Sequence, residues 1–188
     1  MRYLTDAWLV LLLSLIFGAT LAGVEMGLGE RIRQNRLNET LSQIPTLVPG
    51  AEKGEKAEVG DIKQLFKALN ADGTHAGWVL QVQGDGYADT ITVLIGVDAK
   101  VETLTGIYVL EQKETPGLGN KIENEKWRAQ FRGKSVVDTL VGATKTTPTE
   151  PWQVKAVTGA TISSQSVCDI VNDGVKKLRE ALQAEKTN

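Results

Sequence analysis

The sequence predicts a membrane-anchored α+β protein, with a single N-terminal transmembrane helix followed by an antiparallel sheet that carries helices on one face. Three observations predict this fold. Residues 7–24 contain no charged side chain. Residues 78–112 contain three segments with the β-branched, alternating character of strands. Residues 163–182 place apolar side chains at the three- and four-residue spacing of an amphipathic helix.

The uncharged N-terminal segment has the length of a membrane-spanning helix. Ala7 to Val24 is 18 residues long, which is enough to cross a bilayer. The alternative is a cleaved signal peptide, for which Thr20-Leu21-Ala22 would serve as a cleavage site. The run exceeds the usual apolar core of a signal peptide, and Arg2 before it is offset by Asp6. We therefore expect an uncleaved anchor.

The stretch after the anchor predicts a helix, a linker and a second helix. Residues 25–44 are mixed polar and apolar without proline, which predicts a helix that lifts the folded domain from the bilayer. Pro45 and Pro49-Gly50 are expected to end it, and the charged residues 51–60 to form a linker. Apolar residues at helical spacing within 61–69 predict a short helix.

Residues 78–112 predict an antiparallel meander of three strands. The expected strands are 78–83, 90–97 and 101–112, with a turn at 84–86. The spacing between them is too short for helical crossovers. A dinucleotide-binding site around the Gly-Asp-Gly at 84–86 is therefore not expected.

The remainder of the chain predicts further helices around a short strand. We expect a helix at about 120–130, a short strand at 135–137, a loop at 144–151 and an extended segment at 152–157. The last helix has Ser163 or Ser164 as its N-cap. Its apolar face consists of Val167, Ile170, Val171, Val175, Leu178 and Leu182.

These elements divide the chain into three regions. We expect residues 1–25 to form the N-terminus and the transmembrane helix, residues 26–60 a connecting helix and linker, and residues 61–188 the folded domain.

Composition excludes several classes of function. A net charge of −2 indicates no nucleic-acid partner. One cysteine, Cys168, excludes an intrachain disulfide and an all-cysteine iron–sulfur site, and its place near an apolar helix face predicts burial. The one histidine, His75, lies between glycines in an expected surface turn, and we expect neither a metal site nor a catalytic nucleophile–base pair.

The run Thr158-Gly159-Ala160-Thr161-Ile162-Ser163-Ser164 is the strongest candidate for a ligand site. Gly-Ala-Thr occurs three times in the chain, but only the copy ending at Thr161 opens a helix. A helix N-terminus offers free N–H groups and a positive dipole end to a phosphate, and small residues allow close approach. The alternative is a capped helix in which Thr161 is only a turn residue.

A second candidate is the loop that follows the third strand. Thr115-Pro116-Gly117-Leu118-Gly119 contains two glycines that would let its backbone lie flat against a ring. The alternative is an ordinary strand-to-helix connection. Glu114, just before this loop, is either a buried acceptor of hydrogen bonds or a solvated surface acid.

Together these two segments resemble the FMN-binding domain family, which includes the G subunit of the Rnf complex and the C subunit of the sodium-pumping NADH:quinone reductase. Ala156 to Ser164 is similar to the family's flavinylation motif, and Glu114 to Lys121 to the Glu-Thr-Pro-Gly-Leu-Gly loop of the Rnf G subunit. The resemblance implies FMN held covalently by a phosphoester to Thr161. The other cofactor-binding residues it implies are Thr158, Gly159, Ala160, Ile162, Ser163, Glu114, Thr115, Gly117, Leu118 and Gly119.

The resemblance also implies the function and the partners. It implies an electron-carrying subunit of an Rnf-type complex that couples ferredoxin/NAD electron transfer to Na⁺ or H⁺ transport, with membrane, iron–sulfur and flavin subunits as partners and a flavin transferase for maturation. The alternatives are the equivalent subunit of the sodium-pumping reductase, or a membrane-anchored assembly module without flavin. Lys155 keeps the last alternative open, because the family usually has Asp at this position.

Two arguments about membrane orientation oppose each other. Arg31, Arg33 and Arg36 after the anchor outnumber Arg2 before it, which by the positive-inside rule favours a cytoplasmic domain. The resemblance implies a single-pass protein of the cytoplasmic membrane with a cytoplasmic N-terminus and its flavin domain on the non-cytoplasmic side. Because one short anchor makes the charge rule weak, we expect the non-cytoplasmic orientation.

Overall fold

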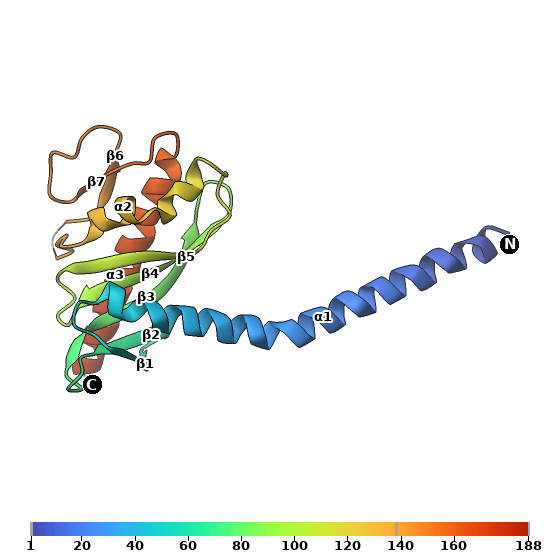
Figure 1. Ribbon diagram of the computed structural model, residues 1–188, viewed down its shortest axis with the longest axis horizontal. Helices are drawn as coiled ribbons and strands as arrows, with labels where there is room; N and C mark the ends of the chain where they lie inside the picture. The colour runs from blue at the N-terminus through green and yellow to red at the C-terminus, as the bar shows by residue number, and fades with distance from the viewer. Residues whose placement is uncertain (1, 138, 188) are drawn as a thin grey trace. The chain divides into compact units, whose positions relative to one another are not determined.

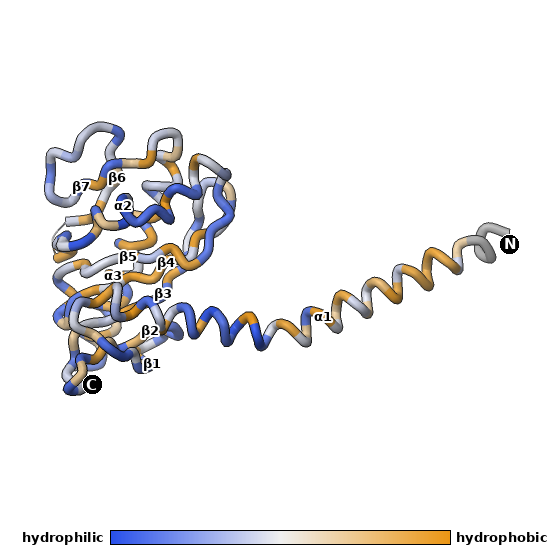
Figure 2. The backbone as a smooth tube through the Cα atoms, viewed as in Figure 1, coloured by the Kyte–Doolittle hydropathy of each residue, from blue (hydrophilic) through white to orange (hydrophobic). Residues whose placement is uncertain are grey.

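The computed structural model describes residues 2–137 and 139–187, and the chain divides into two compact units, Met1–Glu39 and Thr40–Asn188. The first unit belongs to helix α1 (Arg2–Leu47). Figure 2 shows apolar residues concentrated in the N-terminal part of this helix and hydrophilic residues toward its other end. Among the described residues, Ala7–Leu47 is the one helical segment long and apolar enough to cross a membrane.

Helix α1 passes through Pro45 instead of ending there. The proline lies within the last turn, and the Val48 N–H donates to the Ile44 carbonyl at 2.9 Å, so the helical pattern of hydrogen bonds resumes beyond it. A proline in the final turn removes only one hydrogen bond, which packing can offset. The predicted helix end at Pro45 was therefore early by two residues.

The second unit is built on a five-stranded antiparallel meander (Figure 1). Its strands, adjacent in the order of the sequence, are β1 (Lys53–Val59), β2 (Ile62–Leu69), β3 (His75–Asp85), β4 (Thr90–Asp98) and β5 (Leu104–Glu111). The predicted meander of three strands is confirmed as β3 to β5. Strand β3 continues through the expected turn at 84–86 as far as Asp85, and His75 is its half-buried first residue.

The predictions of a linker at 51–60 and a helix at 61–69 were wrong. These residues form the hairpin of β1 and β2, which turns at Gly60 with φ of 53°. Charged residues are common on an exposed edge strand such as β1. In β2, the neighbouring Leu65 and Phe66 are both buried because they point to opposite faces of a sheet that is covered on both sides. Because both neighbours are apolar, the sequence of β2 lacks the alternation of a strand and resembles the pattern of a helix.

Helices cover both faces of the sheet, not one face as predicted. On one face α3 (Thr161–Thr187) packs Val171 and Val175 into the core that contains Leu80 and Ile95. On the other face the end of α1 places Ile44, Leu47 and Val48 against a second cluster, which contains Phe66, Val79 and Leu94. The alternation of side chains along each strand supplies both cores.

Short elements connect β5 to α3. They are η1 (Gly119–Glu123), α2 (Glu125–Arg128), η2 (Ala129–Phe131), β6 (Gly142–Thr144) and β7 (Gln153–Lys155). The single helix predicted at 120–130 is interrupted at Asn124, whose side chain accepts from the Lys126 N–H and caps α2. The strand predicted at 135–137 is reduced to one bridge between Thr103 and Ser135. Strands β6 and β7 pair in parallel on either side of the expected loop.

The last helix begins at Thr161, so Ser163 and Ser164 lie inside its first turn and are not N-caps as predicted. Cys168 is buried in this helix, as expected. Burial raises the pKa of its thiol to about 12, which keeps the group protonated and unreactive at neutral pH.

The packing of α1 on the sheet predicts different outcomes for two paired glycines. Gly96 on β4 and Gly106 on β5 are cross-strand partners beneath Leu47. A Cβ at Gly96 would lie 2.7 Å from Thr105 Oγ1 and 2.9 Å from the Leu47 carbonyl oxygen, whereas at Gly106 the nearest atom is 3.4 Å away. We expect Gly96→Ala to lower the free energy of unfolding by about 1–3 kcal/mol. Gly106→Ala should change it by less than about 1 kcal/mol.

Urea unfolding of the full chain in detergent, followed by tryptophan fluorescence, measures both variants. Equal destabilisation by the two substitutions would show that the end of α1 does not press on the sheet at Gly96.

Candidate functional site

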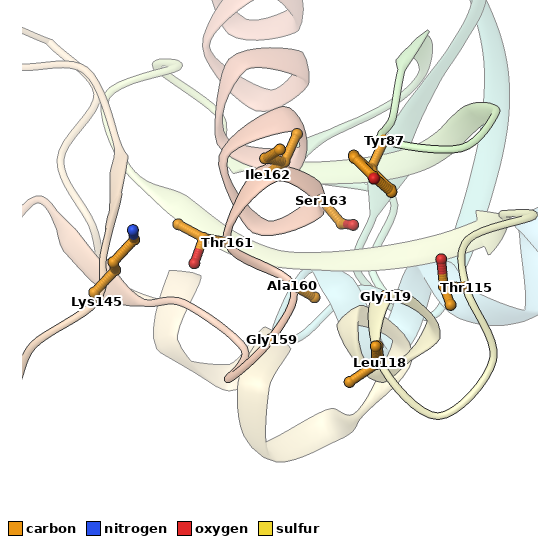
Figure 3. Close-up of a pocket in the computed structure, with 10 residues that line it drawn as sticks. All are labelled: Tyr87, Thr115, Leu118, Gly119, Lys145, Gly159, Ala160, Thr161, Ile162 and Ser163. Atoms are coloured by element: carbon orange, nitrogen blue, oxygen red, sulfur yellow. The ribbon is translucent and has the colours of Figure 1, made fainter.

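A pocket of about 560 Å³ lies where the turn before α3 meets the loop after β5. Figure 3 shows the side chains that surround it. The residues that line it are Tyr87, Thr115, Leu118, Gly119, Lys145, Gly159, Ala160, Thr161, Ile162 and Ser163. Segments far apart in the sequence therefore form one site.

The turn that presents Thr161 is held by hydrogen bonds. Gly159 has φ of 82°, a left-handed conformation that favours glycine, and the Ala160 N–H donates to the Val157 carbonyl at 2.9 Å. The buried Ser164 hydroxyl accepts from the Val157 N–H at 3.0 Å and donates to the Ala160 carbonyl at 2.8 Å. These contacts fix the chain just before α3, so half-buried Thr161 starts the helix at the pocket.

The carboxylate of Glu114 joins three elements behind the pocket wall. Only 4% of the residue is exposed. Its Oε1 accepts the N–H groups of Tyr87 (2.8 Å) and Ala88 (3.0 Å), in the turn between β3 and β4. Its Oε2 accepts the Ser163 hydroxyl of α3 at 2.6 Å. Glu114 is thus the buried acceptor that was one of its two predicted roles.

The surroundings of Glu114 favour its charged form. Burial by itself would raise the pKa of this carboxyl group. The hydrogen bonds from Ser163 and from the backbone of residues 87–89 outweigh burial and hold the pKa below its ordinary value. The carboxylate is therefore ionised at neutral pH.

Two glycines leave the room that Glu114 occupies. A Cβ at Gly119 would lie 2.7 Å from Glu114 Cβ and 3.1 Å from Ser163 Oγ. A Cβ at Gly86 would overlap Glu114 Oε1. The glycine at 119 thus serves the packing of the carboxylate as well as the wall of the pocket.

The structure brings most of the predicted site residues together at the pocket. Thr158, Gly117 and Glu114 do not line it: Thr158 is exposed, and Glu114 lies behind the wall. Gly117 has φ of 77° and donates its N–H to Asn120 Oδ1 at 2.8 Å. Its positive φ, which L side chains rarely adopt, is the reason for a glycine in this turn, since a Cβ there would meet no other atom within 4 Å.

Sequence reasoning missed two residues that line the pocket, Tyr87 and Lys145. Tyr87 is an aromatic residue in a turn, and it is 64% exposed. A large exposed aromatic side chain next to a glycine is a weak signal by itself. Lys145 follows the second Gly-Ala-Thr, which forms β6, and only the contact of β6 with α3 brings it near Thr161.

The two ends of the pocket differ chemically. Figure 3 shows Lys145 and the Thr161 hydroxyl toward one side, with Tyr87 and Thr115 at the other. The first turn of α3 adds N–H groups that have no acceptor within a helix. Leu118 and Ile162 present exposed apolar surface, 44% and 58% accessible. A ligand with a phosphate and a flat ring system matches this arrangement.

Within the described part of the chain, no group of three or more His, Cys, Asp or Glu side chains is placed to hold a metal ion. The side chains that line the pocket offer hydroxyl groups, the ammonium group of Lys145 and apolar surface.

Comparison with known proteins places these residues in a family. A family model described as the FMN-binding domain matches residues 86–176, a range that contains both walls of the pocket. The chain is 30% identical over 164 residues to the G subunit of an ion-translocating oxidoreductase complex from Methanosarcina acetivorans. That alignment covers 87% of this chain and 84% of the relative.

Two further proteins extend the comparison. The G subunit of the Na⁺-translocating ferredoxin:NAD⁺ oxidoreductase complex of Acetobacterium woodii is 40% identical over 91 residues, which cover 48% of this chain and 43% of that protein. The crystal structure of the C subunit of the Na⁺-translocating NADH-quinone reductase from Parabacteroides distasonis superposes with a TM-score of 0.54 at 25% identity. It covers 61% of this chain and 60% of that one. The resemblance seen in the two sequence motifs is thereby confirmed, and the chain belongs to the FMN-binding domain family that includes the G subunits of ion-translocating oxidoreductase complexes.

Proposed function

We propose that this chain is the electron-carrying flavoprotein subunit of a membrane-bound, Rnf-type complex that couples ferredoxin/NAD electron transfer to the movement of Na⁺ or H⁺. In this proposal FMN is held by a phosphoester to Thr161 Oγ. One observation carries it: in a chain of the FMN-binding domain family, the turn ending at Thr161 and the loop after Glu114 form the two walls of one pocket.

The residues of the pocket fit a phosphate-tethered flavin. Thr161 would supply the hydroxyl oxygen, and backbone N–H groups at the start of α3 would be available to the phosphate. Gly159 and Gly119 both line the pocket, and neither has a side chain that would stand between the ligand and the backbone. Leu118, Ile162 and Tyr87 provide surface for the isoalloxazine ring. When bound, FMN supplies one- and two-electron transfer, while the protein holds and orients it.

An open pocket suits an electron carrier. Electron transfer requires a ring edge close to a partner's cofactor, and it requires no acid–base group at the ring. Membrane anchoring through the N-terminal helix agrees with relatives that are subunits of ion-translocating complexes. We place the folded domain on the non-cytoplasmic side.

Lys155 does not oppose this proposal. Its backbone is held in β7, where its carbonyl accepts Trp127 Nε1 at 2.8 Å and its N–H donates to Gln130 Oε1 at 2.7 Å. Its side chain lines a separate hollow beside Trp127 and Val157. Lys155 therefore does not line the pocket proposed for the flavin, and we infer that an acidic residue here would serve recognition by the flavin transferase. The alternatives remain the equivalent subunit of the sodium-pumping quinone reductase and an assembly module without flavin.

We expect Thr161→Ala to abolish covalent FMN, because it removes the oxygen that forms the ester. The fold should persist, since a small side chain replaces another at the half-buried first residue of α3. Thr158→Ala is the matched control, because Thr158 lies three residues earlier, is exposed and does not line the pocket. Intact mass and in-gel fluorescence of the denatured chain, co-expressed with its transferase, measure the outcome. A fluorescent Thr161→Ala band would place the ester on another residue.

We expect Glu114→Gln to loosen the pocket in a pH-dependent way. The pKa of Glu114 is lower in the folded protein than its ordinary value of 4.5. The carboxylate therefore stabilises the fold at pH values above 4.5, and this contribution disappears as pH falls through the lower folded pKa. At pH 7 the variant should lose about 1–3 kcal/mol of unfolding free energy, since buried N–H groups lose a charged acceptor. The difference from wild type should shrink as pH falls below 4.5 and through the lower folded pKa.

Urea unfolding at several pH values measures this difference, with Glu58→Gln on exposed edge strand β1 as the control. A difference that stays constant over this pH range would show that Glu114 is not the charged acceptor.

We expect Lys56→Cys to react with a membrane-impermeant maleimide in intact cells, because Lys56 is exposed on β1 in the domain that we place outside. The native Cys168 is a suitable silent background, since it is buried and its pKa is raised to about 12. Labelling that occurs only after the membrane is permeabilised would place the domain in the cytoplasm, as the positive-inside rule predicts from Arg31, Arg33 and Arg36.

A further inference from the structure

We propose that Lys145 is the residue that pairs with the phosphate of the flavin and makes the pocket selective for FMN over riboflavin. This inference rests on the proposed function and adds to it a residue outside both sequence motifs. It assigns the ammonium group to the phosphate and not to the isoalloxazine ring.

Lys145 is the one charged side chain among the described residues that line the pocket. Figure 3 places it across a gap from Thr161, with Tyr87 and Thr115 on the far side of the helix start. A phosphate bonded to Thr161 Oγ would therefore occupy the end of the pocket that Lys145 faces. The ring would extend toward Leu118 and Tyr87, away from the ammonium group.

The backbone on either side of Lys145 is held close to α3. The Ala143 N–H donates to the side chain of Gln165, on α3, at 3.0 Å. The Thr144 carbonyl accepts the Ala156 N–H at 2.8 Å, which ties it to the segment that leads into the Thr161 turn. The position of the lysine backbone is thus determined by the same helix that carries Thr161.

The side chain of Lys145 has no structural role that would explain its place. It is exposed, and its ammonium group makes no ion pair or hydrogen bond with the residues that the structure describes. By contrast, Lys134 donates to the carbonyls of Pro151 (2.5 Å) and Gln153 (2.8 Å) and holds its loop. Lys145 can therefore be replaced without removing a contact on which the fold depends.

Charge explains why a lysine is useful here. Backbone N–H groups at a helix start attract a phosphate through partial charges, and a lysine adds a full charge on a flexible stem. Glu114 lies nearby, but both of its oxygens accept hydrogen bonds behind the wall. Because the Glu114 oxygens are already engaged by other donors, the ammonium group of Lys145 is available to offset the negative charge of the phosphate.

The test uses the full-length Thr161→Ala chain in detergent, to which flavins bind without an ester. Flavin fluorescence is titrated with FMN and, separately, with riboflavin. FMN should bind more tightly than riboflavin, and the preference should shrink as NaCl is raised. Adding Lys145→Met should weaken FMN binding about five- to tenfold and leave riboflavin binding unchanged. Lys145→Arg should retain most of the preference.

The matched control is Lys155→Met in the same background, because Lys155 is an exposed lysine that does not line this pocket. A second measurement uses the flavinylated chain: the phosphorus-31 resonance of the ester should move in Lys145→Met and not in Lys155→Met. If the Thr161→Ala chain binds neither flavin measurably, the phosphorus-31 comparison alone tests whether Lys145 lies at the phosphate.

The outcomes separate the two proposals. Equal weakening of FMN and riboflavin by Lys145→Met would assign the lysine to the ring and overturn the inference. Identical behaviour of Lys145→Met and Lys155→Met in both measurements would also overturn it. Covalent flavin that persists in Thr161→Ala would instead overturn the proposed attachment site, whatever Lys145 does.

Discussion

The buried carboxylate of Glu114 is the interaction on which the candidate site depends. Its two oxygens connect the β3–β4 turn to Ser163 of α3, and its own backbone starts the loop after β5. An ionised group is costly to bury unless hydrogen bonds compensate it. Here several donors do so, and the compensation also lowers the pKa. The same bonds that keep the charge stable therefore hold the walls of the pocket at fixed separation.

The glycines near Glu114 follow from this constraint. Gly86 and Gly119 are positions at which any side chain would displace the carboxylate or the Ser163 hydroxyl. Gly117 and Gly159 answer a different need, because both have positive φ and allow the backbone to turn. Glycines that look alike in the sequence thus serve packing in two positions and chain direction in two others.

The sheet is covered by two helices that serve different parts of the protein. Helix α3 covers one face and begins at Thr161, while residues 44–48 at the end of α1 cover the other face. Helix α1 contains both the apolar N-terminal segment and, in the second unit, the residues that pack on the sheet. Because β4 contributes Leu94 to one core and Ile95 to the other, both helices are anchored on the same strands.

The sequence by itself determined the elements whose signals are local. Short apolar runs bounded by turn residues, β-branched in β4, specified β3 to β5. Helical periodicity specified α3, and the order of Gly159, Ala160 and Thr161 put a hydroxyl at the helix start. The uncharged run at 7–24 likewise specified the candidate membrane segment. None of these features requires knowledge of a distant partner.

Only the tertiary structure decided what depends on distant contacts. Ser163 and Glu114 are 49 residues apart, and nothing in either local pattern predicts their hydrogen bond. Tyr87 and Lys145 join the pocket only through turns and strands that pack beside α3. The β1–β2 hairpin was misread for the same reason, because Leu65 and Phe66 are buried by helices on opposite faces of the sheet. Periodicity records which side of an element is buried, and it does not record what buries it.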